Sequence, residues 1–156
     1  MITLNSDAAS TSLSKTTKAI LNEYGIKLNK NLGQNYLIDR NKRDQIIQFG
    51  NLTKDDVVLE IGPGIGTLTI ELAKRVKKVI AIEQDSNICQ ILENRLKKEN
   101  IDNVELINDD ALNVEFPKFD KIISNLPYQI SSPITFKFLN YDFQLAILMY
   151  QKEFAS

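Results

Sequence analysis

A glycine-rich turn, GPGIG at residues 62–66, is the feature of this sequence that most limits the folds open to it. It directly follows the apolar run Val57–Ile61 and precedes a segment with apolar residues at helical spacing, Leu68, Leu72 and Val76. A buried strand that passes through such a turn into a helix is typical of an open parallel sheet, because parallel strands need crossover connections. The sequence therefore predicts an α/β fold.

Short β-branched runs alternate with helical periodicity along the rest of the chain, as expected for such a sheet. We expect strands at Val57–Ile61, Val79–Glu83, Val104–Ile107, Lys121–Ser124 and Leu145–Tyr150. We expect helices at about Arg40–Phe49, from Thr67, around Ile88–Leu96, and from Ser131 to about Leu139. The predicted architecture is Rossmann-like, an open and mostly parallel sheet with helices on both faces.

The N-terminal part of the chain carries weaker signals. The first 13 residues are polar and small, and we expect a mobile tail with no structural role. A short helix is expected at 14–24, and Asp39 can cap the helix that begins at Arg40. We therefore divide the chain into a tail and short helix at 1–28 and one α/β domain at 29–156.

Composition excludes several kinds of chemistry. The 156 residues include no histidine and one cysteine, Cys89, which removes the usual zinc sites, an intrachain disulfide and every imidazole-dependent triad. The 19 Lys and Arg residues balance 20 Asp and Glu residues, so a nucleic-acid partner would have to meet a local basic patch. No apolar run approaches the roughly 20 residues of a membrane span. We expect a cytoplasmic protein that binds no metal and no membrane.

The glycine turn has the chemistry of a nucleotide-binding loop without matching either common nucleotide pattern. Glycine permits positive φ and close approach of a ligand, and the following helix adds the positive end of its dipole. The pattern G-x-G-x-x-G fails because Thr69 stands at its last position, and no Gly-Lys-Ser/Thr follows for a P-loop. What remains is E-x-G-x-G-x-G beginning at Glu60. The alternative is a tight turn that binds nothing.

Acidic residues follow the next two strands, at the carboxyl edge of the expected sheet. Glu83 ends the second strand, where a carboxylate can accept two hydrogen bonds from a ribose diol. Asp109 and Asp110 follow the third strand, where a carboxylate can accept from the amino group of adenine. Because no Lys or Arg cluster beside the turn could meet a di- or triphosphate, the pattern favours S-adenosylmethionine with its positive sulfonium. The alternative for each acid is an ordinary surface carboxylate.

The segment Asn125-Leu126-Pro127-Tyr128 leaves the fourth strand at the same edge. The side-chain oxygen of Asn125 and the carbonyl oxygen of Leu126 or Pro127 can accept both N–H groups of an exocyclic base amine. Such acceptors orient the nitrogen and favour its pyramidal form, so no strong base is needed. Tyr128 can stack on a base taken out of its helix. The alternative is an ordinary strand exit with a packing tyrosine.

Four segments in order resemble one protein family. They are NLGQNYLID at 31–39, EIGPGIGTLT at 60–69, DAL at 110–112 and NLPYQISSP at 125–133. Together they are similar to the small-subunit ribosomal RNA adenine-N6 dimethyltransferases, with the erythromycin-resistance methylases as relatives. The likeness extends over about residues 15–155, and the segment 149–155 looks most like archaeal members.

The resemblance implies a class I S-adenosylmethionine-dependent methyltransferase domain and a role for each matched residue. It implies cofactor binding by Gln34, Asn35, Leu37, Gly62, Gly64, Glu83, Asp110 and Asn125, and catalysis by Asn125, Leu126, Pro127 and Tyr128. Asp109 departs from the glycine that commonly precedes the aspartate, which we expect to be tolerated. The implied reaction transfers two methyl groups to each of two adjacent adenosines near the 3′ end of small-subunit rRNA, during ribosome biogenesis.

Length is the main departure from the family. Family members continue with two further strands, a proline-rich segment and a small helical domain that touches the ribosome. We therefore expect an incomplete domain in which the strand Leu145–Tyr150 is a bare edge. A complete chain is expected to be a monomer that meets the small-subunit precursor. The alternative function is that of a fragment that only binds cofactor or ribosomal RNA.

Basic residues before the glycine turn give partial support for an RNA-facing surface. The members of this predicted patch are Lys27, Lys30, Arg40, Lys42 and Arg43, and the same stretch contains Asp39 as its acid. A net excess of positive charge could contact several phosphates and would make binding depend on salt. The alternative is an exposed helix and loop with ordinary solvating side chains.

Overall fold

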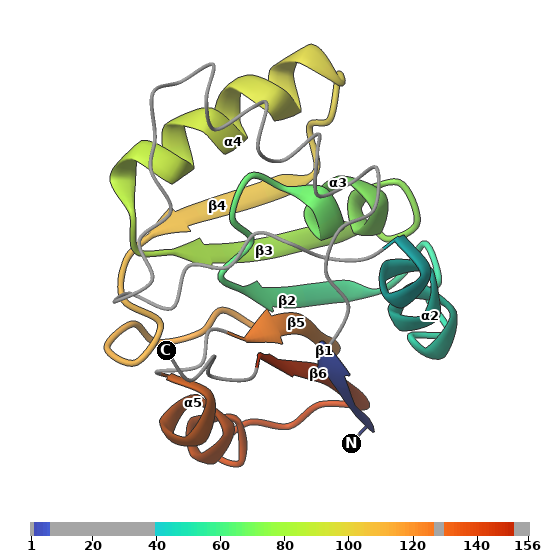
Figure 1. Ribbon diagram of the computed structural model, residues 1–156, viewed down its shortest axis with the longest axis vertical. Coiled ribbons are helices and arrows are strands. Elements are labelled where there is room, and N and C mark those ends of the chain that lie inside the picture. The colour runs from blue at the N-terminus through green and yellow to red at the C-terminus, as the bar shows by residue number, and fades with distance from the viewer. Residues whose placement is uncertain (1, 7–39, 127–129, 152–156) are drawn as a thin grey trace.

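The computed structural model describes residues 2–6, 40–126 and 130–151 of the chain (Figure 1). The strands are β1 (Ile2–Ser6), β2 (Val57–Ile61), β3 (Lys78–Glu83), β4 (Val104–Asn108), β5 (Lys121–Leu126) and β6 (Leu145–Gln151). The helices are α2 (Arg40–Phe49), α3 (Thr67–Ala73), α4 (Ser86–Lys98) and α5 (Ser131–Phe138). None of these helices is long and apolar enough to cross a bilayer.

The strands within the described residues form one sheet in the order β1-β6-β5-β2-β3-β4, and every neighbouring pair is parallel. The chain runs outward from β2 through β3 to β4, returns to β5 beside β2, and then continues to β6. The order of the strands therefore reverses between β2 and β5. This topology confirms the Rossmann-like α/β sheet that the alternating pattern predicted.

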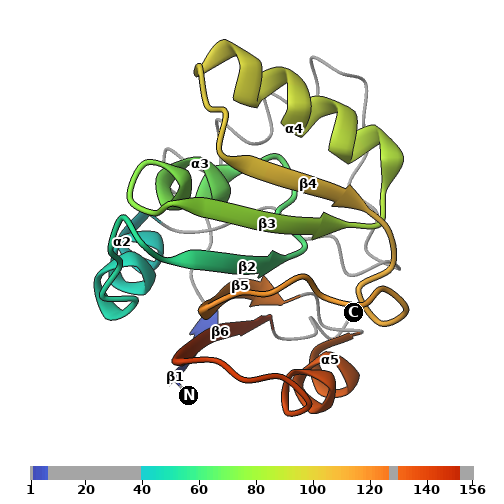
Figure 2. The same ribbon diagram turned by 180° about the vertical axis from the view of Figure 1, so that it is seen from behind.

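The two faces of the sheet are covered by different elements, because the crossovers on the two sides of the reversal lie on opposite faces. On one face, α2 and α3 pack against alternate strand residues such as Val58, Val79 and Ile147. On the other face, α5 and the connection from β4 to β5 cover Leu59 and Ile80. Figure 2 shows this connection in front of the sheet.

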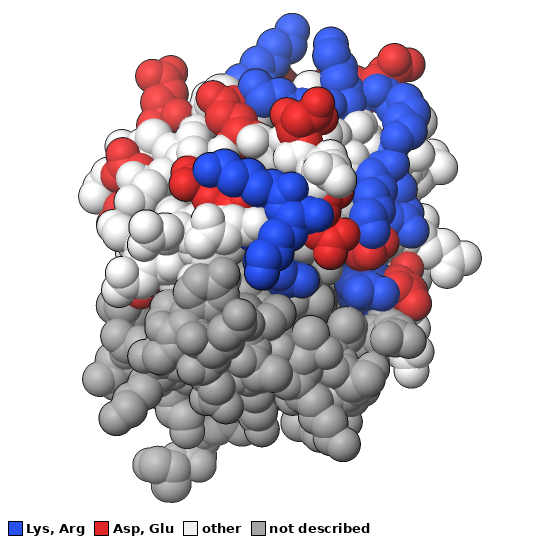
Figure 3. Space-filling view, turned by 90° about the horizontal axis from the view of Figure 1, so that it is seen from above, with Lys and Arg blue, Asp and Glu red and all other residues white. Residues whose placement is uncertain are grey.

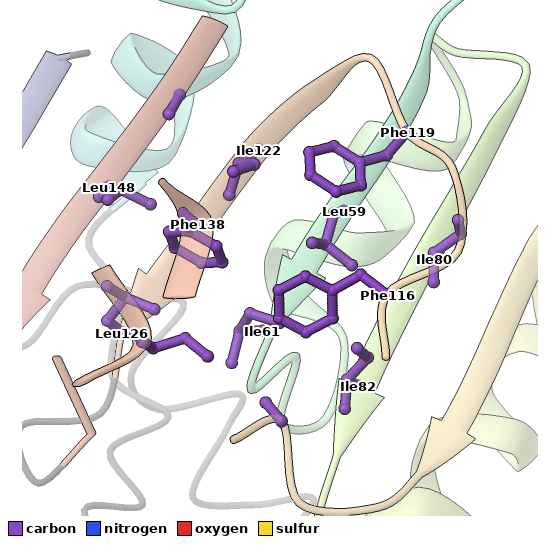
Figure 4. Close-up of a cluster of buried hydrophobic side chains, with 13 residues drawn as sticks. Leu59, Ile61, Ile80, Ile82, Phe116, Phe119, Ile122, Leu126, Phe138 and Leu148 are labelled. Atoms are coloured by element: carbon purple, nitrogen blue, oxygen red, sulfur yellow. The ribbon is translucent and has the colours of Figure 1, made fainter. Parts of the chain in front are cut away.

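Aromatic side chains let that connection cover the sheet without forming a helix. Phe116 and Phe119 are buried and pack with Phe138 of α5 over strands β2, β3 and β5 (Figure 4). The ring centroids of Phe116 and Phe138 lie 5.9 Å apart. Burying one such side chain stabilises the fold by about 1.5–3 kcal/mol, so these aromatic residues hold the segment that follows β4 against the core.

The expectation that the first 13 residues have no structural role is wrong. Residues 2–6 form β1, which pairs in parallel with β6 from Ile2 opposite Ile147 to Ser6 opposite Gln151. The expected bare edge of the last strand is therefore also corrected, since β1 lies on the side of β6 away from β5. The predicted helix at 14–24 and the predicted cap Asp39 lie outside the described residues.

Helix α3 ends earlier than its apolar pattern indicates. The pattern extends to Val76, yet the helix stops at Ala73, although Val76 remains buried. The N–H of Arg75 donates to the carbonyl of Leu72 at 2.9 Å, which tightens the last turn. The N–H of Lys77 already donates to the carbonyl of Asp56 at 2.9 Å, at the entrance to β2, so the chain has turned back toward the sheet.

A buried ion pair joins three elements at the amino edge of the sheet. Lys121 Nζ lies 2.8 Å from Asp56 Oδ2, and both side chains are 7% exposed. The same ammonium donates to the carbonyls of Gly50 and Asn51, just after α2. Burial raises the pKa of Asp56, but Lys121 and the N–H of Thr53 outweigh burial and hold this pKa below its ordinary value. The pair therefore fixes α2 to the starts of β2 and β5.

Lys121→Met should destabilise the protein by about 3–5 kcal/mol, because it leaves Asp56 buried without its partner. The control is Lys78→Met, which breaks the exposed pair with Glu105, where the side chains are 43% and 44% exposed, and should cost less than about 1 kcal/mol. Urea unfolding of the two variants measures the difference. Equal losses would contradict a structural role for the buried pair.

Candidate functional site

The glycine turn requires glycine at three positions. Gly62, Gly64 and Gly66 have φ values of 69°, 58° and 96°, in the region that residues with a Cβ rarely adopt. Gly66 is also the N-cap residue of α3, and a Cβ there would lie 2.5 Å from Leu92 Cδ1 of α4. The turn therefore combines a left-handed backbone with close packing against the neighbouring helix.

Two side chains hold the turn from outside. Arg95 of α4 donates to the carbonyl of Ile65 at 2.8 Å. Glu83, the last residue of β3, accepts the N–H of Gly64 at 3.3 Å through Oε1. Glu83 Oε2 accepts the N–H of Asp85, which caps α4, at 3.0 Å. The carboxylate of Glu83 therefore connects the glycine turn to the start of α4.

Glu83 is buried, which raises the pKa of its carboxyl group above the ordinary value, while the N–H groups of Asp85 and Gly64 oppose that effect. Each carboxylate oxygen has a second acceptor direction beyond the N–H group it already binds. The geometry is therefore compatible with two further donors, such as the two hydroxyls of a ribose.

A second carboxyl group lies under the turn. Glu60 of β2 is buried and accepts the hydroxyl of Thr69 on α3 at 2.5 Å. Burial raises the pKa of Glu60 to about 8, and the negative charge of Glu83 adds to this rise, whereas Thr69 opposes it. Glu60 thus fixes the strand to the helix on both sides of the glycine turn and shares its surroundings with another acid.

The segment after β4 lies against the end of β3. Asn108 donates to the carbonyl of Glu83 at 2.9 Å, and the N–H of Asp109 donates to the same carbonyl at 3.1 Å. The carboxylate of Asp110 accepts the N–H of Leu112 at 2.9 Å and the side-chain amide of Asn113 at 3.2 Å. These contacts place Asp110 in a compact turn next to the strand end that carries Glu83.

Strands β2 and β5 separate at their carboxyl ends, and one hydroxyl bridges them there. Their ladder pairs Val58 with Lys121 and Leu59 with Ile122, and the same register would place Ile61 opposite Ser124. Ser124 Oγ instead accepts the N–H of Ile61 at 3.1 Å and donates to its carbonyl at 2.6 Å. A side chain therefore takes the place of the backbone ladder immediately before Asn125.

Asn125, the residue after Ser124, has a hydrogen-bond acceptor without a partner. Its Oδ1 is buried and has no hydrogen-bond partner, and it alone has this property among the side-chain atoms of the described residues. A buried acceptor without a donor costs about 1–3 kcal/mol, so a hydrogen-bond donor placed beside this oxygen would be favoured. Leu126 is buried in the core through its side chain.

The predicted site residues thus fall into two groups. Gly62, Gly64, Glu83, Asp110, Asn125 and Leu126 lie at or just after the carboxyl ends of strands β2 to β5, and the N–H of Gly64 joins two of these residues directly by donating to Glu83. Gln34, Asn35, Leu37, Pro127 and Tyr128 lie outside the described residues, and their roles stay predictions. In residues 40–126 and 130–151, no three His, Cys, Asp or Glu side chains are grouped as a metal site requires.

The predicted basic patch is described only at its end. Lys27 and Lys30 lie outside the described residues, and Arg43 lies 3.4 Å from Asp44 as an ion pair. On the side of the molecule where α4 lies, seen from above in Figure 3, Lys and Arg side chains are interspersed with Asp and Glu. This face therefore offers mixed charge, and the RNA-facing patch stays a prediction for residues 27–43.

Sequence reasoning missed three residues that shape the site, namely Arg95, Asn108 and Ser124. Arg95 follows Ile91 and Leu92 on the apolar stripe of α4, so a charged residue at an inward position was a usable signal. For Ser124 and Asn108 no local pattern was available, because their contacts depend on where another strand ends.

Comparison with known proteins places the chain among ribosomal RNA methyltransferases. A family model described as ribosomal RNA adenine dimethylase matches residues 25–156. A protein from Methanosphaera stadtmanae, named probable ribosomal RNA small subunit methyltransferase A, is 59% identical over 139 residues. A protein of the same name from Methanothermobacter thermautotrophicus is 58% identical over 139 residues. These matches cover 89% of this chain but 51% and 50% of the relatives, so the chain spans about half their length.

Solved structures give the same picture. A dimethyladenosine transferase from Plasmodium falciparum superimposes with a TM-score of 0.69 at 40% identity, over 73% of this chain and 42% of that one. The 23S rRNA methyltransferase ErmE superimposes with a TM-score of 0.66 at 33% identity, over 74% and 48% of the two chains.

Glu60→Gln should make the protein more stable at pH 8 and flatten the pH dependence of its stability. Because the folded-state pKa of Glu60 is about 8 against an ordinary value near 4.5, the native state keeps a proton that the unfolded state loses. This group's contribution is therefore complete below pH 4.5 and is lost as the pH rises toward 8, on the order of 1 kcal/mol per pH unit. Gln keeps an acceptor for Thr69 and does not titrate.

Thermal unfolding between pH 5 and 8 measures this effect. Glu71→Gln is the matched control, because partial burial raises the pKa of Glu71 but Arg75 and Lys74 outweigh burial and hold it below the ordinary value. That variant should gain no stability at pH 8. A Glu60→Gln variant with the same pH profile as the parent chain would show that Glu60 is ionised in the native state.

Proposed function

The chain belongs to the ribosomal RNA adenine dimethylase family, and from this premise we propose that it transfers methyl groups from S-adenosylmethionine to N6 of adenosines in small-subunit rRNA. The proposed partner is the precursor of the small ribosomal subunit, in the cytoplasm. The relatives named as rRNA methyltransferases are about twice as long as the chain. The proposal therefore rests on the site residues of this chain as well as on its family.

One observation carries the proposal. Asn125 Oδ1 is a buried acceptor without a partner, at the edge where the glycine turn and Glu83 also lie. An exocyclic amine supplies the N–H donor that this oxygen lacks. The amide oxygen would hold the target nitrogen beside the methyl donor.

The residues at the edge suit S-adenosylmethionine by their donors, acceptors and charge. When bound, this cofactor supplies an electrophilic methyl group on a positively charged sulfur. Glu83 would accept the ribose hydroxyls and Asp110 the amino group of adenine, since both carboxylates keep free acceptor directions. The glycine turn would let the backbone approach the ligand closely. The buried carboxyl group of Glu83 beside the turn also favours a cation over a phosphate.

For this transfer the protein would mainly position the two reactants, and it would need little proton chemistry. The bound cofactor would supply the methyl carbon and its sulfur would keep the electrons of the S–C bond, while the target nitrogen would provide the lone pair for the N–C bond and lose one proton to water. Asn125 would accept a hydrogen bond from the N–H of the target amine. This bond would keep the target nitrogen pyramidal and aimed at the methyl carbon. Orientation of a reacting pair can lower the barrier by about 7–11 kcal/mol, which fits a site without histidine.

The half-length coverage favours a second candidate function. In this alternative, the chain binds the cofactor or ribosomal RNA without methylating it, because part of the target-base site lies in the additional length of the relatives. Calorimetry and a transfer assay distinguish the two functions, since both predict cofactor binding and only the first predicts product.

Asn125→Ala should lower methyl transfer to unmethylated small subunits by about 100-fold or more, because it removes an acceptor made for the transition state. Its affinity for S-adenosylmethionine should change only a few-fold. Labelled cofactor and detection of N6-dimethyladenosine measure the first quantity, and calorimetry measures the second.

Asn87→Ala, on the exposed first turn of α4, is the matched control and should leave both quantities unchanged. Cofactor binding by the parent chain without any transfer would support the binding-only alternative. Full transfer by Asn125→Ala would reject the acceptor role, and no binding of the cofactor by the parent chain would reject both functions.

A further inference from the structure

Lys137 of α5 reaches across to the segment that follows Asp110. Its Nζ donates to the carbonyl of Ala111 at 2.8 Å and to the carbonyl of Val114. The same ammonium lies 4.3 Å from the centroid of the Phe116 ring, close enough for a cation–π interaction. A partly buried lysine therefore makes three contacts with one short segment of another element.

The segment that Lys137 holds is a single helical turn with Asp110 at its start. The carbonyl of Asp110 accepts the N–H groups of Asn113 and Val114, at 2.9 and 3.1 Å. The carbonyls of Ala111 and Val114, within and at the end of this turn, both accept from one ammonium, and a cation is favoured at the carbonyl end of a helical turn. Lys137 supplies that cation, so it closes the end of the turn opposite the carboxylate.

The negative charge of Asp110 also acts on Lys137. Partial burial lowers the pKa of Lys137, and the negative charges of Asp110 and Glu115 oppose this effect. The ammonium thus lies within the electrostatic reach of the carboxylate that would meet adenine. Loss of the ammonium would free the two carbonyls that Lys137 holds in the turn beginning at Asp110.

We propose that Lys137 is a positioning residue that holds Asp110 for recognition of the cofactor's adenine amine, and that it couples this recognition to the helix following the target-base segment. The proposal rests on the proposed function, because it takes Asp110 as the adenine contact. Helix α5 begins at Ser131, six residues after Asn125. Lys137 therefore connects the helix that follows Asn125 with the turn that would select the cofactor.

The ratio of the affinities for two ligands tests the positioning role, because general destabilisation would lower both affinities and leave their ratio unchanged. S-adenosylhomocysteine carries an amino group at C6 of its purine, and S-inosylhomocysteine carries an oxygen there. An aspartate that accepts from the amine should prefer the first ligand by about tenfold or more. Calorimetry with both ligands gives this ratio, and unfolding of the ligand-free protein reports stability separately.

Lys137→Met should weaken binding of S-adenosylhomocysteine by about tenfold and leave binding of S-inosylhomocysteine nearly unchanged, so that the ratio falls toward one. Lys137→Arg keeps a cation that can donate to both carbonyls and should restore most of the ratio. Lys118→Met removes an exposed lysine from the same connection and should keep the ratio of the parent chain. Should Lys137→Met fail to fold, Lys137→Gln carries the same expectation.

An unchanged ratio in a folded Lys137→Met or Lys137→Gln variant would overturn the positioning role. An equal loss of affinity for both ligands would also overturn it, because that result means general damage to the site. If the parent chain bound neither ligand, the proposed function itself would fail. A parent chain that binds both ligands equally would show that Asp110 does not read the amine.

Discussion

The separation of β2 from β5 is the constraint on which the rest of the site depends. Chain order reverses between these strands, so the loops that leave them turn to opposite faces and leave backbone groups without ladder partners. One hydroxyl, that of Ser124, pairs with both the backbone N–H and the backbone C=O of Ile61. The bridge lets the glycine turn and Asn125 leave adjacent strands at the same height without leaving unpaired backbone in the core.

Electrostatics then limits what this edge can bind. Glu60 and Glu83 are both buried, which makes ionisation of either carboxyl group costly, and the charge of Glu83 adds to this cost at Glu60. Thr69 and two backbone N–H groups offset part of that cost. A ligand with positive charge offsets more of it, whereas a phosphate would increase it. The preference for a sulfonium therefore follows from the acids under the turn as well as from the residues that would touch the ligand.

Local signals were enough to predict most of the sheet. Strand β2 and helix α2 have the predicted limits, Val57–Ile61 and Arg40–Phe49, because β-branched runs, periodicity and a following glycine define them within one segment. The edge position of Glu83 and Asp110 also followed from strand ends. The bond from the N–H of Gly64 to Glu83 and the contacts of Lys137 with the segment after Asp110 could not be predicted, since each joins elements that are far apart along the chain.

Strand β1 shows why an edge is the hardest part of a sheet to predict. Its pairing partner lies more than 140 residues away in sequence, and an edge strand needs only one side of its backbone matched, so composition constrains it weakly. The alternation of Ile2 and Leu4 with Thr3 and Asn5 has the period of a strand and was a usable signal. By pairing with β6, these residues satisfy the outward N–H and C=O groups of a strand whose residues 146–149 are all buried. An open edge at β6 would favour pairing with another chain, so the amino-terminal strand protects the half of the sheet that carries Asn125.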